Sequence, residues 1–213
     1  MLDWLLKLIY FLFYLIVVKM SEITVKQTNR GTGAGGANTT ANGIKLEEKT
    51  RNAYTSNFNM SKIIWEGGKS KLEEGSFNGD ERKLIRALGR AGFKHWDVMN
   101  HFSKDNEDYK NRGLHGTKEP DDAFIDMVNK NIYWIECKAQ SDTGSVCEKL
   151  QTYTNKIRNL KERYPEYTIK YIYVLDQWFR KKCPWEIKYM IEDNITIVWN
   201  DENFEETLKS VIA

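Results

Sequence analysis

The chain of 213 residues contains only three cysteines, and their spacing excludes the usual cysteine-based sites. Cys137, Cys147 and Cys183 lie far apart, their number is odd, and no two of them form a C-x-x-C pair. Neither a zinc site nor a disulfide framework is therefore indicated. A reducing compartment such as the cytoplasm is the simplest interpretation.

A strong charge of one sign and a histidine cluster are also absent. The formal net charge is +2, so any affinity for nucleic acid must come from local patches. His95, His101 and His115 do not suggest a metal cluster, and we expect His95 and His101 to be structural or surface residues. With 41% hydrophobic and 29% charged residues, the composition and length fit one globular domain.

The only long apolar run stands at the beginning of the sequence. Residues Leu8 to Val18 are eleven consecutive apolar positions, fewer than the roughly 20 that a membrane-spanning helix needs. No small residues of a signal-peptide cleavage site follow this run. Because Met20-Ser21-Glu22 resembles an ordinary protein start, residues 1–20 are either an over-extended reading frame or a membrane anchor. Membrane association is expected only if this segment is retained.

A segment rich in Gly, Thr and Asn comes next. From Gly31 to Ala37 every residue except Thr32 is Gly or Ala, a composition too flexible for the interior of an element. No G-K-[ST] sequence ends the segment, which argues against a phosphate-binding loop. We expect a flexible arm over residues 21–43 and a single domain over residues 44–213.

The apolar pattern from Leu46 onward predicts intermingled helices and strands, most simply arranged around one mixed sheet of an α/β domain. The basic residues Arg82, Arg86 and Arg90 would form a stripe on one predicted helix, facing either phosphates or solvent. The expected elements are a helix over 44–54, a strand over 61–67, a helix over 81–91, an antiparallel hairpin over 121–128 and 132–140, a helix from 145 to near 165, strands over 168–176 and 194–200, and a final helix over 201–211.

The predicted hairpin carries charges among apolar neighbours. Glu136, Lys138 and Gln140 share one face of its second strand. With a suitable register, Asp121 of the first strand and Glu136 come within reach of one cation, and Lys138 lies one step further along. A salt bridge on an exposed sheet face is the alternative, but the flanking "IYWI" indicates a buried strand, where unpaired charges are costly. Buried clustered charges are candidates for a functional site.

Such a set of residues suits the hydrolysis of a phosphodiester. Two carboxylates supply hard oxygen ligands for Mg²⁺, which lowers the pKa of a bound water and stabilises charge on phosphorus. A lysine beside that water orients it and offsets negative charge in the transition state.

Pro120-Asp121, followed after one hairpin by Glu136-Cys137-Lys138, resembles the PD-(D/E)xK nuclease signature. The segments "EPDDAFID", "IYWIECKAQ" and "TGSVCEKL" are similar to type II restriction endonucleases of this superfamily, including those of bacteria and large algal viruses. "NGIKLEEKT" resembles the preceding helix that lends these enzymes a glutamate. The resemblance covers roughly Gly31 to Leu160. It implies an α/β fold with a restriction-endonuclease-like core, in which helices flank a central mixed β-sheet.

The resemblance also assigns roles to four residues. Asp121 and Glu136 would bind Mg²⁺, Glu47 would be the carboxylate of the preceding helix, and Lys138 would lie beside the attacking water. Glu48 is an alternative to Glu47, because the phase of the predicted helix is uncertain by a residue or two.

Asp122 is the rival of Asp121. Strand alternation cannot place both aspartates in the site, and the Pro-Asp match favours Asp121.

Other residues give weaker signals for DNA contact. Gln140 would touch a phosphate or a water, unless it is simply a polar residue at a strand end. Arg112 and His115 lie in the polar loop before Asp121, where bases would be contacted. Arg180 and Lys181 stand among aromatic residues in "QWFRKKCPW", which suits phosphate contact with stacking but equally a basic surface loop.

The resemblance therefore implies a Mg²⁺-dependent, sequence-specific endonuclease that cuts double-stranded DNA at a short site. A palindromic site would be bound by a homodimer, and a cognate DNA methyltransferase is expected in the same restriction system. The alternatives are a structure-specific repair or recombination nuclease of the same superfamily and a catalytically inactive DNA-binding module. A third alternative is a membrane-anchored protein in whose soluble domain the clustered charges only form ion pairs.

Overall fold

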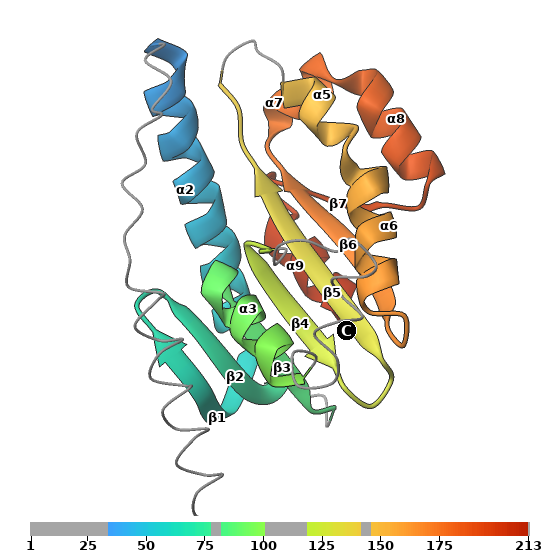
Figure 1. Cartoon of the computed structure of the whole chain (residues 1–213). Coiled ribbons are helices and arrows are strands. Elements are labelled where there is room, and N and C mark those ends of the chain that lie inside the picture. Colours follow the sequence, from blue (N-terminus) through green and yellow to red (C-terminus); the bar gives the residue numbers. More distant parts are fainter. Residues whose placement is uncertain (1–33, 78–81, 101–118, 142–145, 213) are drawn as a thin grey trace, which may run out of the picture. The chain divides into compact units, whose positions relative to one another are not determined.

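The computed structural model describes residues 34–77, 82–100, 119–141 and 146–212 (Figure 1). The chain divides into two compact units, Met1–Gly36 and Ala37–Ala213, and the architecture is that of the second. In chain order the elements are α2 (Ala34–Thr55), β1 (Phe58–Gly67), β2 (Ser70–Phe77), β3 (Leu84–Leu88), α3 (Gly89–Asn100), β4 (Asp122–Asp126), β5 (Asn131–Lys138), α5 (Val146–Leu150), α6 (Tyr153–Arg163), β6 (Thr168–Leu175), α7 (Gln177–Lys182), α8 (Pro184–Glu192), β7 (Thr196–Trp199) and α9 (Phe204–Ile212).

The strands of the described residues form one mixed sheet of seven, whose spatial order follows the sequence. From β1 to β5 each neighbouring pair is antiparallel, whereas β5, β6 and β7 run parallel. Each parallel pair is connected through helices, α5 and α6 between β5 and β6 and α7 and α8 between β6 and β7, because a parallel pair needs a crossover connection. The α/β class and the central mixed sheet flanked by helices are thus confirmed.

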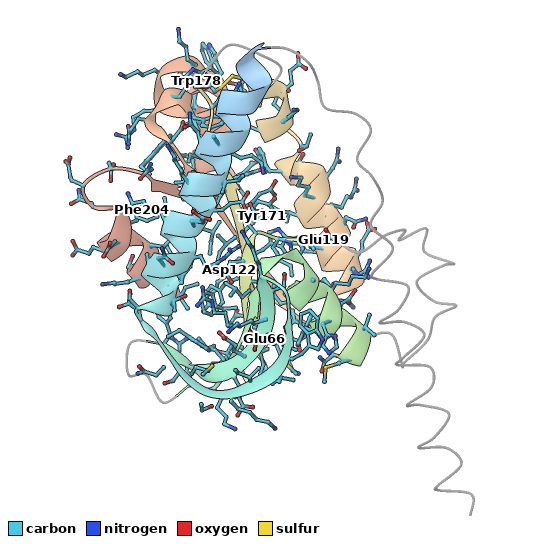
Figure 2. The ribbon with its side chains drawn as sticks, turned by 90° about the vertical axis from the view of Figure 1, so that its left-hand side faces the viewer. Glu66, Glu119, Asp122, Tyr171, Trp178 and Phe204 are labelled. Carbon is cyan, nitrogen blue, oxygen red and sulfur yellow. A yellow bond between two sulfur atoms is a disulfide. The ribbon has the colours of Figure 1, made fainter. Side chains whose placement is uncertain are left out.

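Two hydrophobic clusters pack on the two faces of the sheet. The first contains Trp134 of β5 and side chains from α3, α6 and α8, and the second contains Tyr133 of β5 and side chains from α2 and α9. Figure 2 shows this layering, with α2 and α9 on one side of the sheet and α3 and α6 on the other. The alternation along β5 confirms the predicted faces of the hairpin, because a strand points successive side chains to opposite sides.

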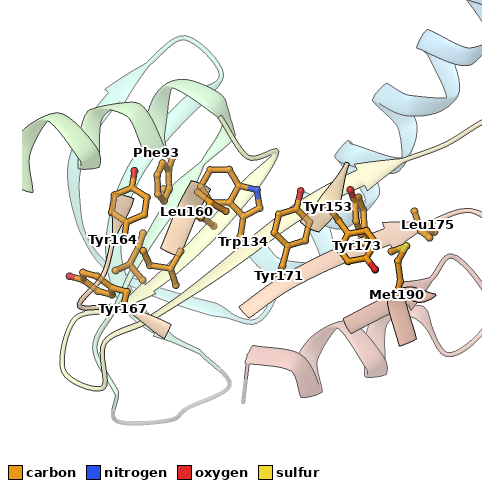
Figure 3. Close-up of a cluster of buried hydrophobic side chains, with 14 of the residues drawn as sticks. Phe93, Trp134, Tyr153, Leu160, Tyr164, Tyr167, Tyr171, Tyr173, Leu175 and Met190 are labelled. Carbon is orange, nitrogen blue, oxygen red and sulfur yellow. The ribbon is translucent and has the colours of Figure 1, made fainter. Parts of the chain in front are cut away.

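Aromatic rings dominate the first cluster (Figure 3). Phe93 of α3 packs edge-on against Trp134 with ring centroids 4.8 Å apart, and Tyr164 after α6 packs edge-on against Phe93 at 5.9 Å. Edge-to-face contacts of this kind add to the free energy of burial. They fix α3 and α6 over the strand that carries Glu136.

The predicted helix over 81–91 is wrong. Leu84–Leu88 is the inner strand β3, paired with β2 and β4, and α3 begins at Gly89. A strand covered on both faces has apolar residues at nearly every position, so its pattern resembles that of a buried helix. Gly89, the first residue of α3, has a φ of +68°, a backbone conformation that disfavours other residues and allows the chain to turn from β3 into the helix. The predicted basic stripe fails with the helix, since Arg86 lies buried in β3.

The N-terminal boundary of the first predicted helix also differs. Residues 34–43, expected in the flexible arm, belong to α2, which continues without interruption to Thr55. The composition of residues 34–43 predicts a flexible segment, but tertiary context readily overrides the intrinsic helix propensity of single residues. The strand β2 was missed as well, since its sequence "SKLEEGSF" is too charged to suggest a strand.

The apolar run of residues 1–20 and residues 21–33 of the expected arm lie outside the described residues. Among the described residues, no helix combines the length and apolar character needed to cross a membrane.

The expectation that the cysteines form no disulfide is wrong. Cys147 of α5 and Cys183, between α7 and α8, are joined by a disulfide, and Cys137 is free and buried. The bonded pair is 36 residues apart in sequence, and only the passage of the chain through α6, β6 and α7 brings its members together. The cysteine-based argument for a reducing compartment therefore loses its support.

Reduction of this bond should lower the thermal stability. Closing a loop of 36 residues stabilises a fold by up to about 4 kcal/mol in the chain-entropy model. We expect dithiothreitol to lower the Tm of the wild-type protein, as measured by differential scanning calorimetry. A Cys147→Ser/Cys183→Ser variant should have the same low Tm as the wild-type protein in dithiothreitol, whether or not dithiothreitol is present. An unchanged wild-type Tm would mean that the bond adds nothing to stability.

Candidate active site

The register of the β4–β5 hairpin brings Asp121 to Glu136. Asp122 pairs with Ile135, and the backbone N–H of Asp121 donates to the Ile135 carbonyl at 3.1 Å. Asp121 Oδ2 accepts a hydrogen bond of 2.8 Å from the backbone N–H of Cys137, the residue after Glu136. The side chain of Asp121 is therefore held at the end of β5, beside both residues of the predicted Glu-x-Lys pair.

The Glu136 carboxylate is surrounded by donors from three elements. Lys138 Nζ lies 2.8 Å from Oε1, and Lys156 Nζ of α6 lies 2.6 Å from Oε1 and 2.9 Å from Oε2. The Tyr171 hydroxyl of β6 donates to Oε2. Burial would raise the pKa of Glu136, but the charges of Lys138 and Lys156 outweigh it and hold the pKa at about 2. Glu136 is therefore ionised at neutral pH, as a metal ligand must be.

Lys138 is an ammonium group at neutral pH. Its side chain is about one-third exposed, and Nζ also donates to its neighbour's carbonyl, that of Cys137, at 3.2 Å. Burial lowers the pKa of Lys138, but the carboxylates of Glu136 and Asp121 outweigh this and raise it above its usual value. Lys138 can thus orient a water and offset negative charge, but it cannot accept a proton in this setting.

Helix α2 contributes a third carboxylate. Glu47 and Asp121 line a common pocket of about 270 Å³. Cys137 Sγ donates to Thr50 Oγ1 at 3.5 Å, so α2 packs directly on the end of β5. Burial raises the pKa of the Cys137 thiol, and the charges of Asp121 and Glu47 raise it further, which places both carboxylates around it.

Glu47 is better placed than its alternative Glu48. Glu47 is half-buried on the side of α2 that faces the sheet, whereas Glu48 is exposed. Glu48 also lines the pocket, but from the exposed side of the helix.

Asp122, the rival of Asp121, points to the opposite face. It is buried and forms an ion pair with Arg86, with Nη2 to Oδ2 at 2.8 Å. Arg86 also donates to Thr55 Oγ1 at 2.9 Å and to the Arg51 carbonyl at 3.2 Å, both in α2. Asp122 and Arg86 therefore join α2 to β3 and β4, and the prediction that strand alternation separates the two aspartates is confirmed.

Two residues of the cluster escaped sequence reasoning. Lys156 lies three residues after Tyr153 and four before Leu160, both buried, so helical spacing could have placed it toward the sheet. Tyr171 pairs with Trp134 across the parallel β5–β6 ladder and lies beside Tyr173 (Figure 3). Alternation along β6 could have assigned it to the face of Glu136, but only in combination with the strand pairing.

The weaker candidates have mixed outcomes. The backbone N–H of Gln140 donates to Asp176 Oδ2 at 2.8 Å, which anchors the chain just after Lys138. Arg180 lies 3.7 Å from Asp201 and over the ring of Trp199 at 4.4 Å. Arg180 is held beside Asp201 and Trp199 but remains exposed, as does its neighbour Lys181.

The histidines and the polar loop were the remaining candidates. His95 stacks on Trp65 with ring centroids 4.6 Å apart, so its predicted structural role is confirmed. Arg112, His115 and His101 lie outside the described residues.

Comparisons of the chain with protein-family models, with curated proteins and with solved structures found no match.

Loss of the Arg86 side chain should destabilise the fold, because it breaks the link between α2 and the strands β3 and β4. Removing one partner of a buried ion pair leaves an uncompensated charge, so Arg86→Met should lower the free energy of unfolding by about 3–5 kcal/mol. Urea denaturation measures this change. Lys83→Met is the matched control, because Lys83 pairs with Glu74 on the surface of the same strand region and should matter by less than about 1 kcal/mol.

The double variant Arg86→Met/Asp122→Asn should lose less stability than the two single variants together, because it removes both charges. Additive losses would show that the pair does not act as a unit.

Proposed function

We propose that the chain is a Mg²⁺-dependent, sequence-specific DNA endonuclease of the PD-(D/E)xK superfamily with a restriction-endonuclease-like core. The observation that carries the proposal is the opposition of Asp121 and Glu136 at the end of the β4–β5 hairpin, with Lys138 in contact with Glu136. The mixed sheet and the helix α2, which precedes the hairpin and places Glu47 in one pocket with Asp121, support the finer assignment of the fold.

The donor set fits a magnesium ion. Asp121 and Glu136, opposed across the hairpin, offer carboxylate oxygens, the hard ligands that Mg²⁺ prefers, and Glu136 is ionised at neutral pH. Glu47 of α2 would add a third carboxylate from the side of Asp121. When bound, the ion would lower the pKa of a coordinated water and stabilise charge on the phosphorus.

The remaining chemistry falls to the side chains of the chain. Lys138 remains protonated, so it orients the attacking water and offsets charge on the phosphate without acting as a base. Cys137 is buried with a raised pKa, so its thiol stays neutral and a cysteine nucleophile is disfavoured.

The proposed substrate and partners are those implied by the resemblance to type II restriction endonucleases. Double-stranded DNA with a short palindromic site would be cut by a homodimer, with a cognate methyltransferase protecting the host DNA. Arg180 and Lys181, basic residues at the end of α7, are the described candidates for phosphate contact, together with Gln140 beside the site.

Digestion of unmethylated phage DNA tests the activity. The wild-type protein should give discrete fragments with Mg²⁺ and none with EDTA. Lys138→Ala and Asp121→Asn should each lower the rate by at least about 100-fold, because each removes a group that stabilises the transition state. Lys62→Ala, which removes an exposed lysine from β1, should leave the rate unchanged.

Other outcomes would redirect the assignment. Cleavage confined to branched DNA would replace the restriction activity with that of a structure-specific repair or recombination nuclease. Tight DNA binding without cleavage of any substrate would leave an inactive DNA-binding module.

The two neighbouring glutamates of α2 allow a matched test of the third ligand. Glu47→Gln should lower the cleavage rate by about 10-fold or more, because it removes a carboxylate that would bind the metal. Glu48→Gln makes the same chemical change one residue away and should cut DNA at the wild-type rate. Equal losses in both variants would count against a specific role for Glu47.

A further inference from the structure

The oxygen atoms of Glu136 are fully engaged by donors. Oε1 contacts Lys138 and Lys156, and Oε2 contacts Lys156 and Tyr171. A carboxylate has about four lone-pair positions, so these four contacts use its ordinary capacity. A cation can therefore coordinate Glu136 only when one of the donors withdraws.

The three donors differ in their freedom to move. Tyr171 is 4% exposed, and its ring packs against that of Tyr173 with centroids 5.2 Å apart. Lys138 belongs to the same strand as Glu136 and also donates to a backbone carbonyl. Lys156 reaches Glu136 from α6 and is about as exposed as Lys138, 34% against 31%, but its described side-chain contacts are all with Glu136, so it can withdraw without breaking a bond to another residue.

We propose that Lys156 competes with Mg²⁺ for the Glu136 carboxylate and so sets the Mg²⁺ concentration at which the site fills. The inference rests on the proposed function, because it takes Glu136 as a metal ligand. A positive charge that contacts both oxygens of a ligand opposes a second cation at the same oxygens, by repulsion and by direct occupancy. Lys156 is thus a regulatory residue of the site and not a catalytic one.

Isothermal titration calorimetry of Mg²⁺ binding tests the competition. Lys156→Met keeps a long side chain but removes the charge, and should bind Mg²⁺ more tightly by on the order of tenfold. Lys156→Arg keeps the charge and should bind much as the wild type does. Lys161→Met removes an exposed lysine from the same helix, and should also leave the affinity unchanged.

A second readout checks that each variant is folded. Mg²⁺ raises the Tm in proportion to the logarithm of its concentration relative to Kd, so the shift in Lys156→Met should begin at lower Mg²⁺. A wild-type or weaker affinity in folded Lys156→Met would overturn the inference.

The inference and the proposed function fail in different ways. DNA cleavage with a Mg²⁺ affinity indifferent to Lys156 would overturn the inference and leave the nuclease. Tighter binding by Lys156→Met without cleavage of any DNA would support the competition and overturn the nuclease. Absence of Mg²⁺ binding in the wild type and in Lys156→Met alike would overturn both.

Discussion

The buried charge of Glu136 is the constraint on which the arrangement around it depends. A carboxylate at the end of a strand lined by Trp134 and Ile135 loses most of its hydration, and only nearby cations and hydrogen-bond donors can offset that cost. These groups come from the same strand, from α6 and from β6. The charge therefore links elements that are distant in the sequence, and it does so where the β4–β5 hairpin delivers Asp121.

Two consecutive aspartates, Asp121 and Asp122, make contacts on opposite faces of the sheet. Asp121 bonds the backbone of Cys137 beside Glu136, while Asp122 pairs with Arg86 on the other side. Through Arg86 the second aspartate also fixes α2, the helix that carries Glu47. The ion pair that stabilises the fold thus also positions a carboxylate of the candidate site, although no metal or substrate would touch it.

The hairpin and its faces could be predicted because strand alternation is a local and strict rule. The same rule assigns Asp121 and Asp122 to opposite faces, since they are adjacent in the sequence. The helix proposed over 81–91 failed because Leu84, Ile85 and Leu88 fit a buried strand as well as a helix.

The environment of Glu136 and the disulfide depend on contacts between distant segments. Lys156 and Tyr171 meet Glu136 only through the packing of α6 and the register of β6, which no local pattern specifies. Cys147 and Cys183 meet across 36 residues for the same reason. Local sequence could therefore identify the acidic residues and Lys138 as candidates, but not the contacts that Lys156 and Tyr171 make with Glu136.

The balance of charge explains why such a site would use a divalent ion. The three carboxylates that would bind the metal, those of Asp121, Glu136 and Glu47, carry three formal negative charges, and the two lysines in contact with Glu136, Lys138 and Lys156, carry two positive ones, so these five groups together have one excess negative charge. A bound Mg²⁺ would turn this excess into one positive charge, which a phosphodiester group then neutralises. A monovalent ion would only cancel the excess and would leave the phosphate without attraction. In the proposed function, metal and DNA therefore favour each other's binding through charge alone, before any base is recognised.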